Sequence, residues 1–202
     1  MKDGETLFQV EGFRALRFER DNLAPVQIFL EANPAYSMLV NGAPARSNEA
    51  ELELTEIPDQ IRPDDAYFLG FWDAGELIGV VHVMRTWPVP GISHVGLFQI
   101  AELRQGTGVA ATLFRALEAW MIAQFDPRWL RLGVVGADDR GQRFWRRMGF
   151  HETGRKQNVR LGVRTHELVV MIKAIHGEDD EVYRQVAAAG PIALETPARP
   201  AE

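Results

Sequence analysis

Hydrophobic positions along the chain follow either a two-residue or a helical period, and the changes between these periods predict the order of the elements. Alternation in 13–20 sets Leu16 and Phe18 against charged neighbours, as in a half-buried strand. In 109–125 the apolar residues recur at helical spacing, with polar residues such as Arg115 opposite them. The pattern predicts strands at 13–20, 66–72, 76–85, 94–101, 129–135, 150–156 and 164–174, and helices at 23–32, 35–40, 109–125, 139–148 and 179–189, with a further helix that starts at 47 and ends before 58.

Turn and capping residues support these limits. Asp73, Ala74 and Gly75 separate two apolar runs, which is a hairpin signal. Gly149 suits the C-terminal end of the helix at 139–148. Pairs of strands with helices between them predict a mixed sheet flanked by helices, that is, an α/β or α+β fold.

Length and composition add a domain estimate. The chain has 202 residues, of which 46% are hydrophobic and 25% charged, as in an ordinary globular protein. This length fits one domain with an appendage, and we expect the domain at 1–175 and a C-terminal tail at 176–202. A short helix is expected in the tail, followed by an Ala/Pro/Glu-rich end.

Charge and cysteine content exclude several classes of function. The net charge of −6 argues against nucleic-acid and anionic-membrane partners and slightly favours a cationic small molecule. The chain has no cysteine, and its five histidines show no close metal-binding spacing, so we expect no metal site. No signal-peptide run or membrane-spanning segment is present in the sequence, which predicts a cytoplasmic protein.

The most informative stretch joins the strand at 94–101 to the helix at 109–125. Gly106 and Gly108 bracket Thr107 at the junction, where glycine permits positive φ and close approach of a ligand to the backbone. The first turn of the following helix has N–H groups without intrahelical partners and a partial positive charge. The stretch therefore predicts a binding site for an anion, most commonly a phosphate.

Two phosphate-bearing ligands fit this stretch. Residues 106–111 match the dinucleotide pattern G-x-G-x-x-A, with Asp138 or Asp139 as the ribose-binding acid. That interpretation requires repeated βαβ units, whereas the sequence predicts one such crossover and an antiparallel hairpin at 66–85. A dinucleotide oxidoreductase is therefore the weakest of the functions considered.

One residue more gives a better match. Gln105 to Ala110 fit the pattern Q/R-x-x-G-x-G/A, and here the chain resembles the GNAT family of N-acetyltransferases. Leu132-Gly133-Val134, Asp138 and the block Phe144-Trp145-Arg146-Arg147-Met148-Gly149-Phe150 add to the resemblance. It covers Arg14 to Ala174 in element order, and its motif-level support lies between Phe98 and Phe150.

The resemblance implies a mixed, mostly antiparallel sheet that splays between its two central strands, 96–101 and 129–135. The pantetheine arm of acetyl-CoA, the acyl-donor substrate, would lie in that split against the strand of Phe98 and Ile100. Gln105 would shape the loop, and Arg104 would contact a phosphate. The pyrophosphate would take backbone N–H groups from Gly106, Thr107, Gly108, Val109 and Ala110.

The resemblance also suggests catalytic roles. The backbone N–H near Ile100 would polarise the thioester carbonyl. Trp145 stands where many relatives have a tyrosine acid, and an indole N–H donates a hydrogen bond but is no usable acid. We expect Trp145 to pack near the sulfur, with a place in the aromatic core as the alternative. Glu102, His82 and His94 are the candidate bases, each with a structural role as the alternative.

Two positions on the next helix have a structural alternative as well. Asp138 replaces a common asparagine; it would cap the helix and could also touch the pantetheine. Arg140, Arg143 and Arg147 recur at helical spacing and are interpreted as a solvated face in preference to phosphate ligands.

These features together predict an N-acetyltransferase that moves an acetyl group from acetyl-CoA to a primary amine by direct attack. The alternative is a non-catalytic acyl-CoA-binding module on the same fold. The acceptor, a small molecule or a peptide amine, would bind against 33–42 and 87–91, with Tyr36 and Trp87 as aromatic walls. A homodimer through the last strands or the tail is compatible with the sequence.

Overall fold

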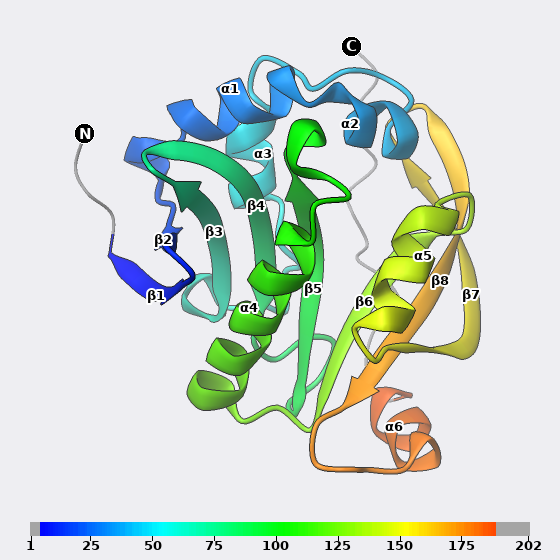
Figure 1. Ribbon diagram of the computed structural model, residues 1–202. Coiled ribbons are helices and arrows are strands. Elements are labelled where there is room, and N and C mark those ends of the chain that lie inside the picture. Colours follow the sequence, from blue (N-terminus) through cyan, green and yellow to red (C-terminus); the bar gives the residue numbers. More distant parts are fainter. Residues whose placement is uncertain (1–4, 189–202) are drawn as a thin grey trace.

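The structure, a computed structural model, describes residues 5–188 and is built around one eight-stranded sheet (Figure 1). The order across the sheet is β1-β2-β3-β4-β5-β6-β8-β7. All neighbours are antiparallel except β5 and β6, which are parallel. The strands are β1 (Thr6–Val10), β2 (Phe13–Arg17), β3 (Ala66–Asp73), β4 (Glu76–Met84), β5 (Ile92–Ile100), β6 (Trp129–Val135), β7 (His151–Leu161) and β8 (Arg164–Ala174).

Helices cover both faces of this sheet, so both faces are apolar. Figure 1 shows α4 and α5 in front of the sheet and α3 behind it. Leu113 and Phe114 of α4 belong to one core cluster with Val81 of β4, while Phe29 of α1 and Val80 of β4 belong to a second cluster on the other face. The helices are α1 (Ala24–Ala32), α2 (Pro34–Val40), α3 (Glu49–Thr55), α4 (Val109–Phe125), α5 (Asp139–Arg147) and α6 (Asp180–Ala187), with short 3₁₀ turns at Arg20–Asn22, Pro63–Asp65 and Glu102–Arg104.

The two central strands, β5 and β6, are paired over only part of their length. β5 pairs with β6 only from Ile92 opposite Trp129 to Val95 opposite Leu132. Beyond that point β5 stays with β4 and β6 stays with β8, so the two halves of the sheet diverge, as Figure 1 shows. The predicted fold class and the predicted split are therefore confirmed.

The N-terminal region differs from the prediction of one strand followed by helices. A hairpin of β1 and β2 opens the described chain, turning at Glu11 and Gly12, both at positive φ (48° and 88°). β1 has no buried residue, so its sequence lacks the alternation that marks a half-buried strand. The strand predicted to run to residue 20 ends at Arg17 and is followed by the 3₁₀ turn Arg20–Asn22.

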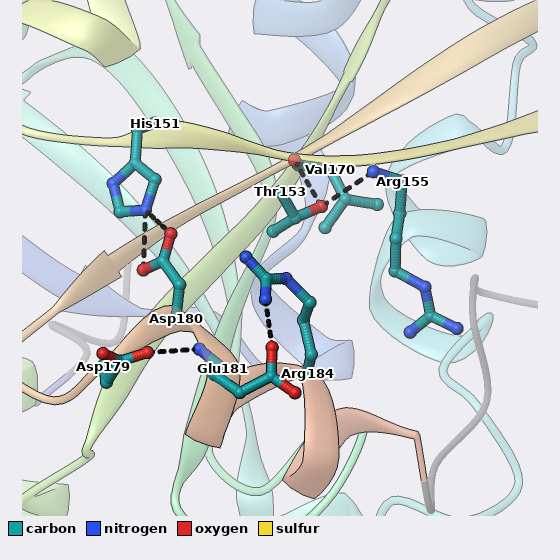
Figure 2. A network of polar contacts seen from close by, with 8 residues as sticks. All are labelled: His151, Thr153, Arg155, Val170, Asp179, Asp180, Glu181 and Arg184. Atoms are coloured by element: carbon teal, nitrogen blue, oxygen red, sulfur yellow. Dashed lines mark hydrogen bonds and ion pairs between the residues drawn. The ribbon is translucent and has the colours of Figure 1, made fainter.

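Helix α6 packs back onto the end of the sheet (Figure 2). The imidazole of His151 on β7 lies 2.8 Å from the carboxylate of Asp180, and Asp179 caps the helix by accepting from the N–H of Glu181. Tyr183 is buried against Trp129. The predicted helix at 179–189 thus runs over Asp180–Ala187; the Ala/Pro/Glu-rich end lies outside the described residues, and the domain boundary after residue 175 stays a prediction.

Candidate active site

A cavity of about 900 Å³ occupies the split between β5 and β6. Its lining includes Phe98 and Trp145 on the face covered by α4 and α5, and Tyr36 and Leu97 on the face covered by α2 and α3. A ligand in this cavity can therefore contact residues of both faces. The same cavity is lined by residues of the predicted cofactor stretch, such as Gly106, and of the predicted acceptor stretches, such as Tyr36 and Trp87.

The loop before α4 has the conformation that the glycines predict. Gly106 and Gly108 have φ of 82° and 93°, and a Cβ placed on either would meet open space. Within the described chain, no protein acceptor bonds the N–H groups of residues 106–110. These donors, with the partial positive charge of the seventeen-residue α4, form an open anion site.

Gln105 ties this loop to the rest of the site. Its Nε2 donates to the carbonyl of Ile100 at 3.0 Å, and its Oε1 accepts from the Arg140 guanidinium at 2.8 Å. The side chain thus connects the end of β5, the loop and the start of α5. Arg140, which the sequence analysis assigned to a solvated face, lines the cavity beside the loop, as Arg147 does.

The edge of β5 that faces the split offers backbone groups to a ligand. The N–H of Ala101 bonds Ile78 of β4, and alternation along an antiparallel pair then turns the N–H groups of Phe98 and Ile100 away from β4, toward the split. The side chain of Ile100 is buried in the core, so this residue contributes its backbone. Both residues predicted for the pantetheine contact line the cavity.

Asp138 caps α5, as predicted. Its Oδ1 accepts from the N–H of Gly141 at 2.8 Å, and a Cβ on Gly141 would come within 2.1 Å of the carboxylate. Asp138 also lines the cavity, so capping leaves it beside a bound ligand. Its contact with the cofactor stays a prediction.

Trp145 belongs to an aromatic cluster at the cavity wall. It is 8% exposed, and its ring lies 4.9–5.6 Å from the rings of Phe98, Phe114, Phe144 and Phe150. A Trp in this setting supplies apolar surface, and its indole N–H titrates far outside the range of an acid catalyst.

Several predicted site residues do not line the cavity. Thr107 and Val109 are absent from the lining, and the Thr107 hydroxyl donates to the carbonyl of Arg104 at 2.7 Å within the loop. The guanidinium of Arg104 contacts the carboxylates of Asp73 and Glu76 at 3.0 and 3.2 Å, so it is engaged at the β3–β4 turn. The structure therefore offers no direct support for the predicted phosphate contact of Arg104.

Glu102 also lies outside the cavity lining of the described chain. Its Oε1 accepts from the N–H of Ala35 at 2.9 Å, and its own N–H donates to Oδ1 of Asn33 at 2.8 Å. These bonds hold the first turn of α2 against the end of β5. The geometry therefore favours the structural alternative for Glu102 over the base.

The candidate bases His82 and His94 lie together in a buried polar group at the cavity wall, and its third member, Arg131, was missed by the sequence analysis. Arg131 donates to Nδ1 of His94 at 3.0 Å. Burial lowers the pKa of His82 to about 4 and, with the charge of Arg131, holds the pKa of His94 well below its ordinary value. An arginine between leucines in the otherwise apolar run at 129–135 is the signal that could have marked it.

The wall expected to receive the acceptor is present. Tyr36 and Trp87 line the cavity, together with other residues of α2 and α3. The tip of the β7–β8 hairpin joins this wall, since Val163 donates to the carbonyl of Asn41 at 2.9 Å and His166 bonds that of Val40 at 2.8 Å. The two diverging halves of the sheet are thereby bridged at the open end of the split.

Two further properties concern residues 5–188 only. Within this stretch, no three His, Asp or Glu side chains gather closely enough to hold a metal ion. None of its helices combines the length and apolarity that crossing a membrane requires.

The split sheet and the open loop after β5 together form a cavity that suits a long phosphate-bearing ligand. The family model for the acetyltransferase (GNAT) domain matches residues 48–170, which is more than half of the chain. The chain therefore belongs to this family. It is an acetyl-CoA-dependent N-acyltransferase, with acetyl-CoA as acyl donor. The resemblance seen in the sequence is confirmed.

Solved structures agree with this fold at low sequence identity. Spermidine N-acetyltransferase from Vibrio cholerae, in complex with CoA and spermine, is 19% identical with a TM-score of 0.63, over 82% of this chain and 96% of that one. Ribosomal-protein-S5-alanine acetyltransferase from Vibrio fischeri is 14% identical (TM-score 0.63, 83% and 95%). A GNAT acetyltransferase from Elizabethkingia anophelis with acetyl-CoA bound is 12% identical (TM-score 0.55, 82% and 100%). No match was found among curated proteins.

Proposed function

We propose that this protein transfers the acetyl group of acetyl-CoA to a primary amine by direct attack of the amine on the thioester. The observation that carries the proposal is the open loop at residues 106–110, whose N–H groups lie beside the unpaired edge of β5 in one cavity. Acetyl-CoA supplies the activated acyl group. The loop fits its pyrophosphate, and the strand edge fits its amide-bearing arm.

The backbone of β5 performs the polarising step in this proposal. The N–H of Ile100 points into the split and donates to the carbonyl oxygen on which negative charge develops. The amine nitrogen forms the new C–N bond, the C–S bond breaks, and the electron pair leaves on sulfur. The proton lost by the amine passes to water in the cavity.

Trp145→Phe is expected to reduce kcat by less than about tenfold, because a thiolate from a thiol of pKa near ~8.5 leaves without a proton donor. Loss of a general acid costs roughly 10²–10⁴-fold instead. Steady-state thiol release with saturating acetyl-CoA measures the change. A drop of about 10³-fold, with the melting temperature kept, would show that Trp145 takes part in proton transfer.

Glu102→Gln is expected to leave the pH dependence of kcat/KM unchanged, since the carboxylate is occupied by the N–H of Ala35 and lies outside the cavity lining. The amide oxygen of glutamine can still accept the hydrogen bond from the N–H of Ala35. Thiol release between pH 6 and 9 tests the point. An activity loss of about 100-fold, the size that loss of a general base produces, would restore Glu102 as the base.

The proposal also covers the position of the acceptor, the cellular location and the oligomeric state. The acceptor lies against α2 and the Trp87 side of the cavity, in a site shared with Tyr36. The cytoplasm is the proposed location, and a homodimer through the last strands or the tail is the proposed assembly.

Calorimetric titration with acetyl-CoA, followed by thiol release over a panel of primary amines, tests the proposal. We expect binding with one ligand per chain and release of CoA with at least one amine. Binding without release over the whole panel would favour the non-catalytic acyl-CoA-binding module. Absence of binding at millimolar acetyl-CoA would contradict the assignment of the cavity.

A further inference from the structure

The buried polar group at the cavity wall is the feature that the proposed function leaves unexplained. His94 of β5 and Arg131 of β6 are paired residues on the two central strands, just before these separate. Both side chains line the cavity, and they are only 3% exposed. They therefore stand at the closed end of the split, where a ligand that enters it stops.

The bond between these two side chains sets the hydrogen-bonding character of the histidine. A guanidinium can only donate, so Nδ1 of His94, 3.0 Å from Arg131, is the acceptor. Burial and the charge of Arg131 keep the imidazole neutral, so its proton is on Nε2. His94 and Arg131 are therefore both donors toward further groups.

The environment of Arg131 is one in which an anion gains from binding. Its guanidinium lies 4.6 Å from the centre of the Trp87 ring and interacts with the phenol of Tyr183. The pKa of Arg131 is lowered, chiefly because burial disfavours its charge. A guanidinium has five N–H donors in a planar fork, which matches a carboxylate.

The surfaces between this end and the entrance are mainly apolar. Met84 and Trp87 line the cavity next to His94, Leu97 lines it opposite His82, and Leu39 and Leu52 line it from α2 and α3. The carboxylates that line the cavity on the α3 side, Glu53 and Glu56, lie on or directly after that helix. The end that holds Arg131 is thus positive and the α3 wall is negative.

We propose that the acceptor is an amino acid, that is, an amine that also bears a carboxylate, and that Arg131 and His94 bind this carboxylate. The inference rests on the proposed function, because it assigns the acceptor of the same reaction. Trp87 and the apolar wall then receive the carbon skeleton. A diamine of equal length would instead bring a second positive charge to the buried guanidinium, so the site selects against it.

The test compares acceptors that differ in this charge, with rates expressed per concentration of free amine because a carboxamide also lowers the pKa of the neighbouring amine. Phenylalanine, leucine and 5-aminopentanoate are each assayed against their carboxamides, and 5-aminopentanoate also against 1,5-diaminopentane, by thiol release at saturating acetyl-CoA. We expect kcat/KM to favour the acid by at least about tenfold in one pair or more. Equal rates in all pairs, or a preference for the amides or the diamine, would overturn the proposal.

Variants and a binding measurement separate this inference from the proposed function. Arg131→Gln is expected to remove the preference for the acid without changing the acetyl-CoA dissociation constant, while Arg147→Gln, at another position of the cavity lining, keeps the preference. If Arg131→Gln does not fold, the comparison in the unaltered protein decides by itself.

Calorimetry with N-acetylphenylalanine and its amide, in the presence of CoA, reports the carboxylate site without turnover. Tighter binding of the acid with no thiol release from any amine would support the carboxylate site and contradict the transferase function. Equal binding of acid and amide alongside normal thiol release would contradict the carboxylate site alone.

Discussion

Replacing Gly108 by valine is expected to raise the dissociation constant for acetyl-CoA by about 100-fold or more. Gly108 has φ of 93° at the N-terminal cap of α4, and a side chain there would extend into the open space above the loop. It would displace a phosphate from the N–H groups of residues 106–110. Two lost charge-assisted hydrogen bonds, at roughly 1.5 kcal/mol or more each, account for a change of this size.

Gly12→Val is the matched control for this experiment. Gly12 has nearly the same φ, 88°, and equally open space around a Cβ, but it lies in the β1–β2 turn. Both variants should lose a similar stability of about 1–2 kcal/mol from the strained backbone. Calorimetric titration should then show weak binding only for Gly108→Val, and equal weakening in both variants would mean that strain alone is responsible.

The periodic parts of the fold could be predicted from the sequence because their signals are local. Helix α4 begins at Val109 and ends at Phe125 as its apolar period predicts, and β6 has its predicted bounds. β1 was missed because it is an edge strand with no buried residue, so its pairing with β2 comes from the turn at Glu11 and Gly12. A partner strand, not a pattern within β1 itself, defines this element.

The candidate site also has a part that local sequence predicts and a part that depends on long-range contacts. The loop at residues 106–110 depends on two glycines and the start of a helix, all within a few residues, so the sequence was sufficient to predict it. The bond between His94 and Arg131 joins residues 37 positions apart, and that between His166 and Val40 joins residues 126 apart. Such contacts follow from the order of strands in the sheet, which hydrophobic periods do not specify.

The same contrast explains the residues whose roles changed. Glu102 and Arg104 lie next to the loop in sequence, and proximity made them candidates. The folded chain turns both toward other partners, Ala35 for Glu102 and the carboxylates of Asp73 and Glu76 for Arg104. The cavity is instead completed by residues distant in sequence, so the proposed acceptor site depends on tertiary structure, while the proposed cofactor loop depends on local sequence.

Stability should fall in mild acid, because two histidines must stay neutral in the folded protein. The pKa of His82 is about 4 in its buried position, against an ordinary value of 6.5, and that of His94 is also well below 6.5. Between pH 6.5 and about pH 4, His82 binds a proton in the unfolded chain but not in the folded chain. The free energy of unfolding therefore decreases as the pH falls from about 6.5 to about 4, by roughly 3 kcal/mol for His82 alone.

The contribution of His82 can be separated from that of the carboxylates, which also weaken the fold in acid. His82→Gln removes the titrating group, so the variant should lose about 3 kcal/mol less than the unaltered protein between pH 7 and pH 4, whatever its stability at pH 7. Urea unfolding followed by circular dichroism at several pH values gives both curves. If the two curves of unfolding free energy against pH are parallel, His82 keeps an ordinary pKa in the folded protein, because water in the cavity that it lines solvates its charged form. A difference that grows steadily below pH 6.5 would identify desolvation of this imidazole as a cause of acid sensitivity in the cavity that we propose as the substrate site.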